Sequence, residues 1–331
     1  MLEHPFYNPP MRAAYREEPC RTALNRVSGM PFRWSLNPYM GCAHRCAFCY
    51  VRGFERRADR PWGEAYGASV RVKVNVVDVL RRELGRRSWR REEVAIGAAT
   101  DPYQPAEGRY RLTRGCIEAL AEARTPLSLI TRGPLVVRDR DVLAEASRRA
   151  EVSVHVSIAT LDAALHRWLE PGVAPPAARL RAIRLLTDAG IRAGLALAPV
   201  LPGLTDAPAQ LGAVIAAARE AGATHMWWNL LNLRPGTRDH FLTVLAAEWP
   251  DELARYERLY PASGSGYLAA ADSRPLDARL RELRARGGVG DRRRIRLAPE
   301  PEPSQLALEL ASEPPPSGAR GGRRAGAVAS V

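Results

Sequence analysis

The chain alternates short apolar runs with amphipathic segments, and this rhythm restricts its possible folds more than any other feature. Runs typical of strands occupy residues 94–100, 127–131, 152–159, 192–200 and 225–233. Segments with helical periodicity lie between them, at residues 113–123, 139–149, 177–189 and 208–221. Strands that alternate with helices form βαβ units, which build a parallel sheet through right-handed crossovers.

A further strand at residues 32–36 brings the predicted number of parallel strands to six. The fold class is therefore α/β, and we predict a partial (β/α)6 barrel, TIM-like but open. A doubly wound sheet is the alternative. The sequence lacks the Gly-x-Gly-x-x-Gly turn by which such sheets bind dinucleotides, so we favour the open barrel.

The rest of the chain divides around this core. We predict an N-terminal arm at residues 1–30, the core at 31–236, a C-terminal helical cap at 237–298 and a disordered tail at 299–331. Within the core, residues 51–67 show no periodicity and indicate an ordered connection. Residues 70–74 indicate a short exposed strand and residues 76–87 a helix. The cap pattern predicts helices at residues 241–249, 252–260 and 276–286.

Three of the five cysteines, Cys42, Cys46 and Cys49, fall within eight residues with the spacing C-x3-C-x2-C. One loop can turn all three thiolates toward a common centre, which indicates a metal site. Closed zinc sites and protein-held four-iron clusters both need four ligands. Either a fourth ligand comes from elsewhere, with His44 completing a Cys3His zinc site, or one metal stays open. We expect Cys20 and Cys116 not to be ligands.

The cysteine loop resembles the radical SAM superfamily, in which an aromatic residue precedes the third cysteine as Phe48 does here. Residues 100–107, Thr-Asp-Pro-Tyr-Gln-Pro-Ala-Glu, and residues 169–172, Leu-Glu-Pro-Gly, resemble the subgroup related to spore photoproduct lyase. The likeness spans about residues 33–240. It implies a [4Fe-4S] cluster on Cys42, Cys46 and Cys49, whose fourth iron binds S-adenosylmethionine (SAM).

The resemblance also implies contacts to SAM from residues that follow the predicted strands. Thr100 and Asp101 match the position of its amino-group contact, since a hydroxyl and a carboxylate both accept from an ammonium. Arg132 matches a basic position that pairs with its carboxylate. Ser157 matches a ribose contact, and the backbone near Phe48 an adenine contact. Ordinary alternatives are a turn role for Asp101, a solvated loop position for Arg132 and a structural hydroxyl for Ser157.

These implications predict an enzyme that cleaves SAM reductively to a 5′-deoxyadenosyl radical and abstracts hydrogen from an unidentified substrate. An external electron donor of the flavodoxin or ferredoxin type would reduce the cluster. A nucleic-acid repair or modification enzyme and a non-catalytic zinc or Fe-S protein are the alternatives. The net charge of +13 keeps nucleic acid open, although Ala98 and Ala99 stand where photoproduct lyases carry a cysteine.

Composition and chain length set the remaining expectations. No apolar run approaches the ~20 residues that span a bilayer, so we expect no membrane contact and a cytoplasmic monomer. His155, His166 and His225 share no spacing typical of a metal site, and we expect them to be structural.

Overall fold

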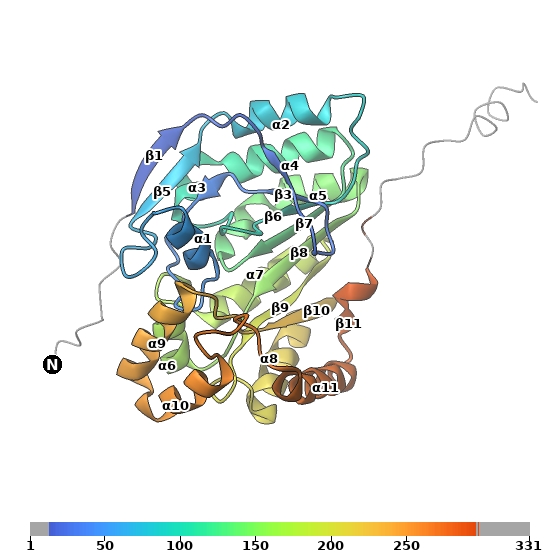
Figure 1. Ribbon diagram of the computed structural model, residues 1–331. Helices are drawn as coiled ribbons and strands as arrows, with labels where there is room; N and C mark the ends of the chain where they lie inside the picture. The colour runs from blue at the N-terminus through green and yellow to red at the C-terminus, as the bar shows by residue number, and fades with distance from the viewer. Residues whose placement is uncertain (1–12, 296, 298–331) are drawn as a thin grey trace, which may run out of the picture. The chain divides into compact units, whose positions relative to one another are not determined.

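Six parallel strands form the centre of an eight-stranded sheet. The computed structural model describes residues 13–295 and 297. Its sheet has the order β11-β10-β9-β8-β7-β6-β3-β2. The six are β3 (Trp34–Leu36), β6 (Val94–Ile96), β7 (Leu127–Thr131), β8 (Val152–Ser157), β9 (Ala193–Val200) and β10 (His225–Leu230). The six predicted parallel strands are thus present (Figure 1), and the short β11 adds a seventh at one edge.

The sheet is open, as predicted for a partial barrel. At one edge β2 (Leu24–Arg26) pairs antiparallel with β3. At the other edge β11 (Gly290–Asp291) pairs parallel with β10. The two edge strands do not pair with each other, so the strands do not close into a full barrel.

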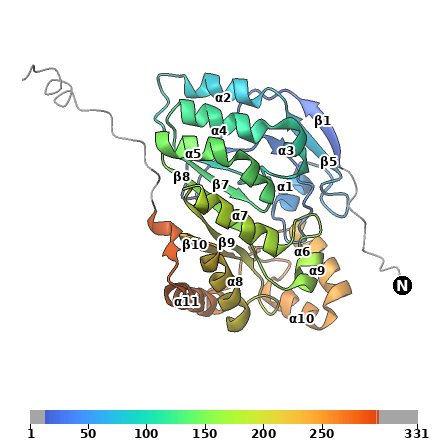
Figure 2. The same ribbon diagram turned by 180° about the vertical axis from the view of Figure 1, so that it is seen from behind.

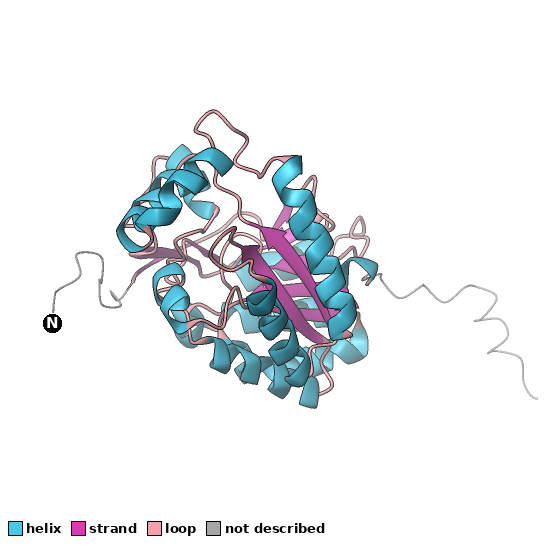
Figure 3. Ribbon diagram, turned by 90° about the horizontal axis from the view of Figure 1, so that it is seen from below, coloured by secondary structure: helices cyan, strands magenta, loops and turns pink. Residues whose placement is uncertain are grey.

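Helices cover the outer face of this sheet (Figures 2 and 3). They are α2 (Val76–Leu84), α4 (Leu112–Glu122), α5 (Arg140–Arg149), α7 (Pro176–Asp188) and α8 (Pro208–Glu220). Strand residues alternate between the two faces of the sheet, and Val152, Val154 and Val156 of β8 join the main hydrophobic core with these helices. The opposite face of β8 therefore carries Ser153 and Ser157.

A second, three-stranded sheet lies beside the barrel, with the order β1-β5-β4. Its strands are β1 (Ala14–Glu18), β5 (Ser69–Lys73) and β4 (Tyr39–Met40). Strands β1 and β2 were not predicted from the sequence. An exposed strand was expected at residues 70–74, whereas Val70 and Val72 are fully buried because they pack in one cluster with Tyr39 and Ala106. Residues 1–12 of the predicted arm lie outside the described part.

Two boundaries inside the core differ from the prediction. The expected connection at residues 51–67 begins with α1 (Val51–Arg57). The expected strand at residues 94–100 ends at Ile96, because Gly97 takes a φ of +90°. A Cβ atom on Gly97 would lie 2.3 Å from the carbonyl oxygen of Ile130, so only glycine fits this turn. Short helices not predicted are α3 (Pro105–Tyr110), η1 (Pro134–Asp139) and α6 (Ala163–Leu169).

The C-terminal helices are longer than predicted. They are α9 (Thr237–Glu248), α10 (Pro250–Leu259) and α11 (Ala270–Gly287), followed by the short η2 (Arg292–Arg294). Phe241 of α9 and Tyr256 of α10 belong to one hydrophobic cluster with Phe48, so these helices cap the cysteine loop. No helix among the described residues has the length and apolarity needed to cross a membrane. The predicted tail at residues 299–331 lies outside the described residues.

A buried polar network fills the region near the amino ends of β8 and β10. The Nδ1 atom of His155 lies 3.1 Å from Nε2 of His225. Arg292 of η2 donates from Nε to Nε2 of His155 at 3.1 Å and forms an ion pair with Glu93 at 3.0 Å. His155 and Glu93 thus connect Arg292 of the C-terminal segment to the strands of the barrel.

Candidate functional site

The three clustered cysteines lie on a loop between β4 and α1 that has no regular structure. Cys42 and Cys46 are buried, Cys49 is half-buried, and all three are free thiols. Two short turns shape the loop: the amide of Arg45 donates to the carbonyl of Cys42 at 3.3 Å, and the amide of Cys49 donates to that of Cys46 at 3.2 Å. Such a loop has little structure of its own, so its neighbours must fix its position.

Gln104 holds one side of this loop from the segment that follows β6. Its side chain is fully buried. The Oε1 atom accepts from the amide of Ala43 at 3.0 Å, while Nε2 donates to the carbonyl of Gly41 at 3.1 Å and to Oγ1 of Thr100 at 2.9 Å. Gln104 therefore connects both neighbours of Cys42 to the segment after β6.

The Leu-Glu-Pro-Gly segment at residues 169–172 holds the opposite side. The carbonyl of Leu169 accepts from the amide of Ala47 at 2.9 Å, and the amide of Gly172 donates to the carbonyl of His44 at 3.1 Å. A Cβ atom on Gly172 would lie 2.5 Å from the carbonyl oxygen of Ala43. The close approach of the two backbones explains why this position carries glycine.

Asp101 lies at the carboxyl end of β6 with its carboxylate buried. It accepts from Oγ1 of Thr131 and from the amide of Arg132, each at 2.6 Å, and from the amide of Tyr103 at 2.9 Å. Nδ1 of His44 lies 3.3 Å from Oδ2 of Asp101, close enough for an ion pair. Burial opposes charge on both groups, but their mutual attraction outweighs it. The pKa of His44 rises to about 10 and the pKa of Asp101 falls.

Thr100, predicted beside Asp101, also uses its side chain within the protein. Its hydroxyl donates to the carbonyl of Gly41 at 2.9 Å and accepts from Gln104. These contacts give Thr100 and Asp101 a role in positioning the cysteine loop and the β7 turn. Direct contact of either residue with SAM stays a prediction.

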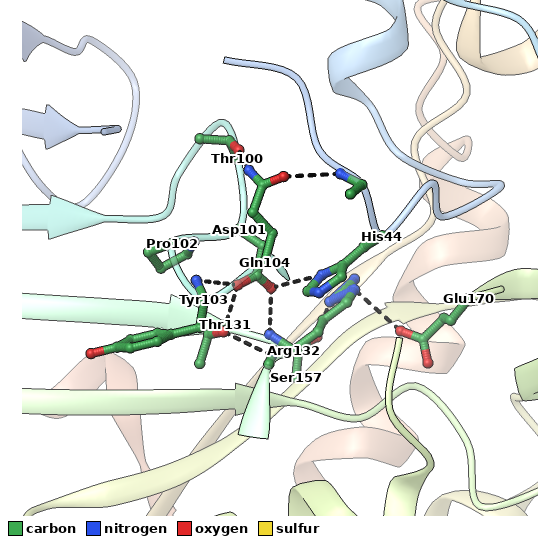
Figure 4. Close-up of polar contacts among 12 residues, drawn as sticks. His44, Thr100, Asp101, Pro102, Tyr103, Gln104, Thr131, Arg132, Ser157 and Glu170 are labelled. Atoms are coloured by element: carbon green, nitrogen blue, oxygen red, sulfur yellow. Dashed lines mark hydrogen bonds and ion pairs between the residues drawn. The ribbon is translucent and has the colours of Figure 1, made fainter. Parts of the chain in front are cut away.

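Arg132 brings together the other predicted residues. Its guanidinium lies 5.2 Å from the ring centroid of Phe48, and it donates to the hydroxyl of Ser157. Its Nε pairs with Glu170 at 3.1 Å, and Glu170 also binds the fully buried Arg179 at 2.7 Å. Arg132 is thus an oriented side chain at the carboxyl ends of β7 and β8, not a solvated loop arginine (Figure 4).

The residues of this loop fit an iron–sulfur cluster with three cysteine ligands. Cys116 is buried on α4 and Cys20 hydrogen-bonds through its backbone to Asn75, so both lie on other elements. Among the described residues, no three His, Cys, Asp or Glu side chains converge as ligands of one metal ion. Cysteine thiolates are ligands both of zinc and of iron–sulfur clusters, and a cubane binds each of its thiolates on a different iron.

The comparison with protein families agrees with this geometry. Residues 36–211, more than half of the chain, match the family model described as the radical SAM superfamily. The chain belongs to the radical SAM superfamily. Membership implies SAM and an iron–sulfur cluster, and it indicates an enzyme.

Two relatives found by sequence comparison are described as uncharacterized proteins. A Mycobacterium tuberculosis protein is 42% identical over 298 residues, which cover 89% of this chain and 86% of that protein. A protein of Acidianus two-tailed virus is 32% identical over 178 residues, covering 51% and 56% of the two chains. Neither relative identifies a substrate.

Among solved structures, spore photoproduct lyase has a similar fold. A variant with bound AdoMet and dinucleoside spore photoproduct has a TM-score of 0.65 at 15% identity, covering 84% of this chain and 80% of that chain. Another variant has a TM-score of 0.63 at 16% identity with the same coverage. At this identity the likeness shows the fold alone.

Several residues that build the site were not predicted from the sequence. Gln104 and Glu170 lie inside the two segments that carry the resemblance, so the signal was present but their roles were not assigned. Arg52 and Tyr66 lie in the segment predicted to be a connection. Both are nearly fully buried beside the cysteine loop.

Proposed function

We propose that this chain is a radical SAM enzyme whose Cys42, Cys46 and Cys49 bind a [4Fe-4S] cluster with one iron open to SAM. The observation that carries the proposal is a clamped loop with three free thiols at the carboxyl ends of the parallel strands, where barrels place their active sites. When bound, cluster and SAM supply a 5′-deoxyadenosyl radical for hydrogen abstraction. An external donor of the flavodoxin or ferredoxin type supplies the electron.

The chain's own residues bind and orient SAM in this proposal. Thr100 and Asp101 face the amino group of SAM, and Arg132 faces its carboxylate. Ser157 contacts the ribose of SAM, and the backbone at Phe48 contacts its adenine. The hydrogen bond from Arg132 to Ser157 and its contact with Phe48 support one shared binding region. The cap helices α9 and α10 pack on the loop and help to exclude water.

Cysteine replacement tests the cluster assignment. After anaerobic reconstitution with iron and sulfide, we expect Cys42→Ala, Cys46→Ala and Cys49→Ala each to lose most of the bound iron, because an open-iron cubane has no spare thiolate. Cys20→Ala and Cys116→Ala are the controls and should keep it. Iron and acid-labile sulfide per chain give the result. A colourless parent protein with stoichiometric zinc would refute the cluster.

Titration with SAM tests the open iron and the binding residues. We expect SAM to change the EPR spectrum of the reduced parent protein and to release 5′-deoxyadenosine slowly without substrate. Asp101→Asn and Thr100→Val should weaken the response to SAM while keeping the iron. No spectral change at saturating SAM in the parent would contradict an open iron, and unchanged affinity in both variants would move the amino-group contact elsewhere.

Action on nucleic acid is a second candidate, favoured by a surface feature beside the loop. Tyr50 and Phe54 are 42% and 41% exposed, their rings form an edge-to-face pair, and Arg57 lies over Phe54 at 4.8 Å. Exposed rings with a guanidinium suit base stacking and phosphate contact. Binding to a single-stranded oligonucleotide should fall steeply with salt and weaken about tenfold in Phe54→Ala. Salt-independent or absent binding would exclude this candidate.

A further inference from the structure

Arg52 is a buried cation next to the cysteine loop, and no carboxylate of the described residues pairs with it. Its exposed fraction is 2%. The guanidinium donates to four carbonyl oxygens: Nε to Cys46 at 3.2 Å, Nη2 to Arg45 at 3.1 Å, and Nη1 to Trp62 at 2.8 Å and Gly63 at 2.6 Å. Within residues 13–295, no Asp or Glu forms an ion pair with it.

Carbonyl oxygens satisfy the hydrogen-bonding capacity of this guanidinium but do not neutralise its charge. A buried ion is strongly disfavoured unless an opposite charge compensates it. The other buried arginine, Arg179, follows this rule, since it pairs with Glu170 at 2.7 Å. Arg52 therefore needs a source of negative charge that side-chain carboxylates do not provide.

The sulfur atoms of the cysteine loop would become negatively charged groups beside Arg52 on binding a cluster. Arg52 binds the carbonyl of Cys46 and lies 4.6 Å above the ring centroid of Tyr66. Tyr66 is 1% exposed, and its hydroxyl lies 3.4 Å from Sγ of Cys49. When Cys49 is a thiolate, the hydroxyl must be the donor, and a cation over the ring makes it a stronger donor.

We propose that Arg52 and Tyr66 tune the cluster: they supply the positive charge and the sulfur hydrogen bond that raise its reduction potential. This inference rests on the proposed function, because it requires the cluster on Cys42, Cys46 and Cys49. A [4Fe-4S] cluster with three thiolate ligands carries a net negative charge, and its reduction would add one further negative charge. A nearby buried cation and a hydrogen bond to sulfur both favour the more negative, reduced state.

Potentiometric EPR titration without SAM measures the effect. Arg52→Met removes the charge and should lower the equilibrium constant for cluster reduction at least tenfold. This corresponds to a fall of about 59 mV in the midpoint potential of a one-electron couple. Tyr66→Phe removes only the hydroxyl and should shift it in the same direction by less. Arg52→Lys should keep most of the parent potential. The exposed Arg57 on the same helix provides the control, and Arg57→Met should not shift the potential because water screens its charge.

The outcomes separate this inference from the proposed function. If the parent binds no cluster, the proposed function itself fails. If the parent binds one and Arg52→Met or Tyr66→Phe retains iron at the parent potential, the tuning role is refuted. If Arg52→Met cannot hold iron, the potentials of Arg52→Lys and Tyr66→Phe test the tuning role. It is then refuted if Tyr66→Phe keeps the parent potential or Arg52→Lys loses it. Loss of iron in all three, with Arg57→Met intact, would show a purely structural pair and would also overturn the proposal.

Discussion

Replacing Gln104 with leucine tests whether the cysteine loop depends on its clamp. Leucine has a similar size but loses three hydrogen bonds at a fully buried position. The carbonyl of Gly41 keeps the bond from Thr100, whereas the amide of Ala43 loses its side-chain acceptor. An orphaned buried amide costs about 1–3 kcal/mol, and each lost bond about 1 kcal/mol, so we expect a destabilisation of about 3 kcal/mol.

The assay has two parts. Urea unfolding of the cluster-free protein, followed by circular dichroism, gives the loss of stability. Transfer of iron from the reconstituted protein to a chelator gives the local effect on the loop. Because about 1.4 kcal/mol corresponds to tenfold in the population of an open state, we expect iron loss to accelerate by more than tenfold.

Gln210 on α8 provides the matched control. Its side chain makes no hydrogen bond to the described part of the chain, so Gln210→Leu should stay within about 0.5 kcal/mol of the parent and release iron at the parent rate. The clamp would be refuted if Gln104→Leu behaved like this control in both measurements.

Two further predictions concern buried charges. Glu170→Gln leaves the fully buried Arg179 without its ion-pair partner and should destabilise the cluster-free protein by about 3–5 kcal/mol. Glu151→Gln breaks an exposed ion pair of equal length and should cost less than about 1 kcal/mol. Urea unfolding measures both, and equal effects would contradict this prediction. Burial and the charge of Arg292 lower the pKa of His225 to about 4. Below its ordinary value of ~6.5 only the unfolded chain binds this proton, so stability should fall by up to about 3 kcal/mol between pH 6.5 and 4; an unchanged slope in His225→Gln would refute the assignment.

The parallel strands were predictable because each is a continuous apolar run bounded by turn residues. Strand β7 has the predicted bounds at residues 127–131. Helix α1 was missed for a physical reason: its buried residues include Arg52, Gly53 and Glu55, which show no apolar periodicity. Arg52, for example, is buried because its guanidinium binds backbone carbonyls of the cysteine loop and of residues 62 and 63. The end of β6 was misplaced because the positive φ of Gly97 depends on the neighbouring β7 backbone.

Some residues of the site could be predicted from the local sequence, whereas others depend on contacts between distant segments. The cysteine spacing and the polar strand ends are local, so the sequence identified Cys42, Asp101 and Arg132 as candidates. Which side chains meet was not predictable, because Gln104 reaches a backbone 61 residues away. Likewise the contact between His155 and His225 joins two strands 70 residues apart. The sequence spacings typical of metal sites do not predict contacts between residues that are so far apart in the chain.

The two clamps explain why the cysteine loop depends on several strand ends of the open barrel. Gln104 follows β6, and the Leu169 to Gly172 segment follows β8 and α6, so opposite sides of one irregular loop are held by the carboxyl ends of different strands. Asp101 and Arg132 connect these ends across β7, and Glu170 fixes Arg132 from the second clamp. A shift of one strand end therefore moves the loop and the residues proposed to bind SAM together. Substitutions in either clamp should impair cluster retention before the sheet itself unfolds, because the main hydrophobic core lies on the other face of the strands.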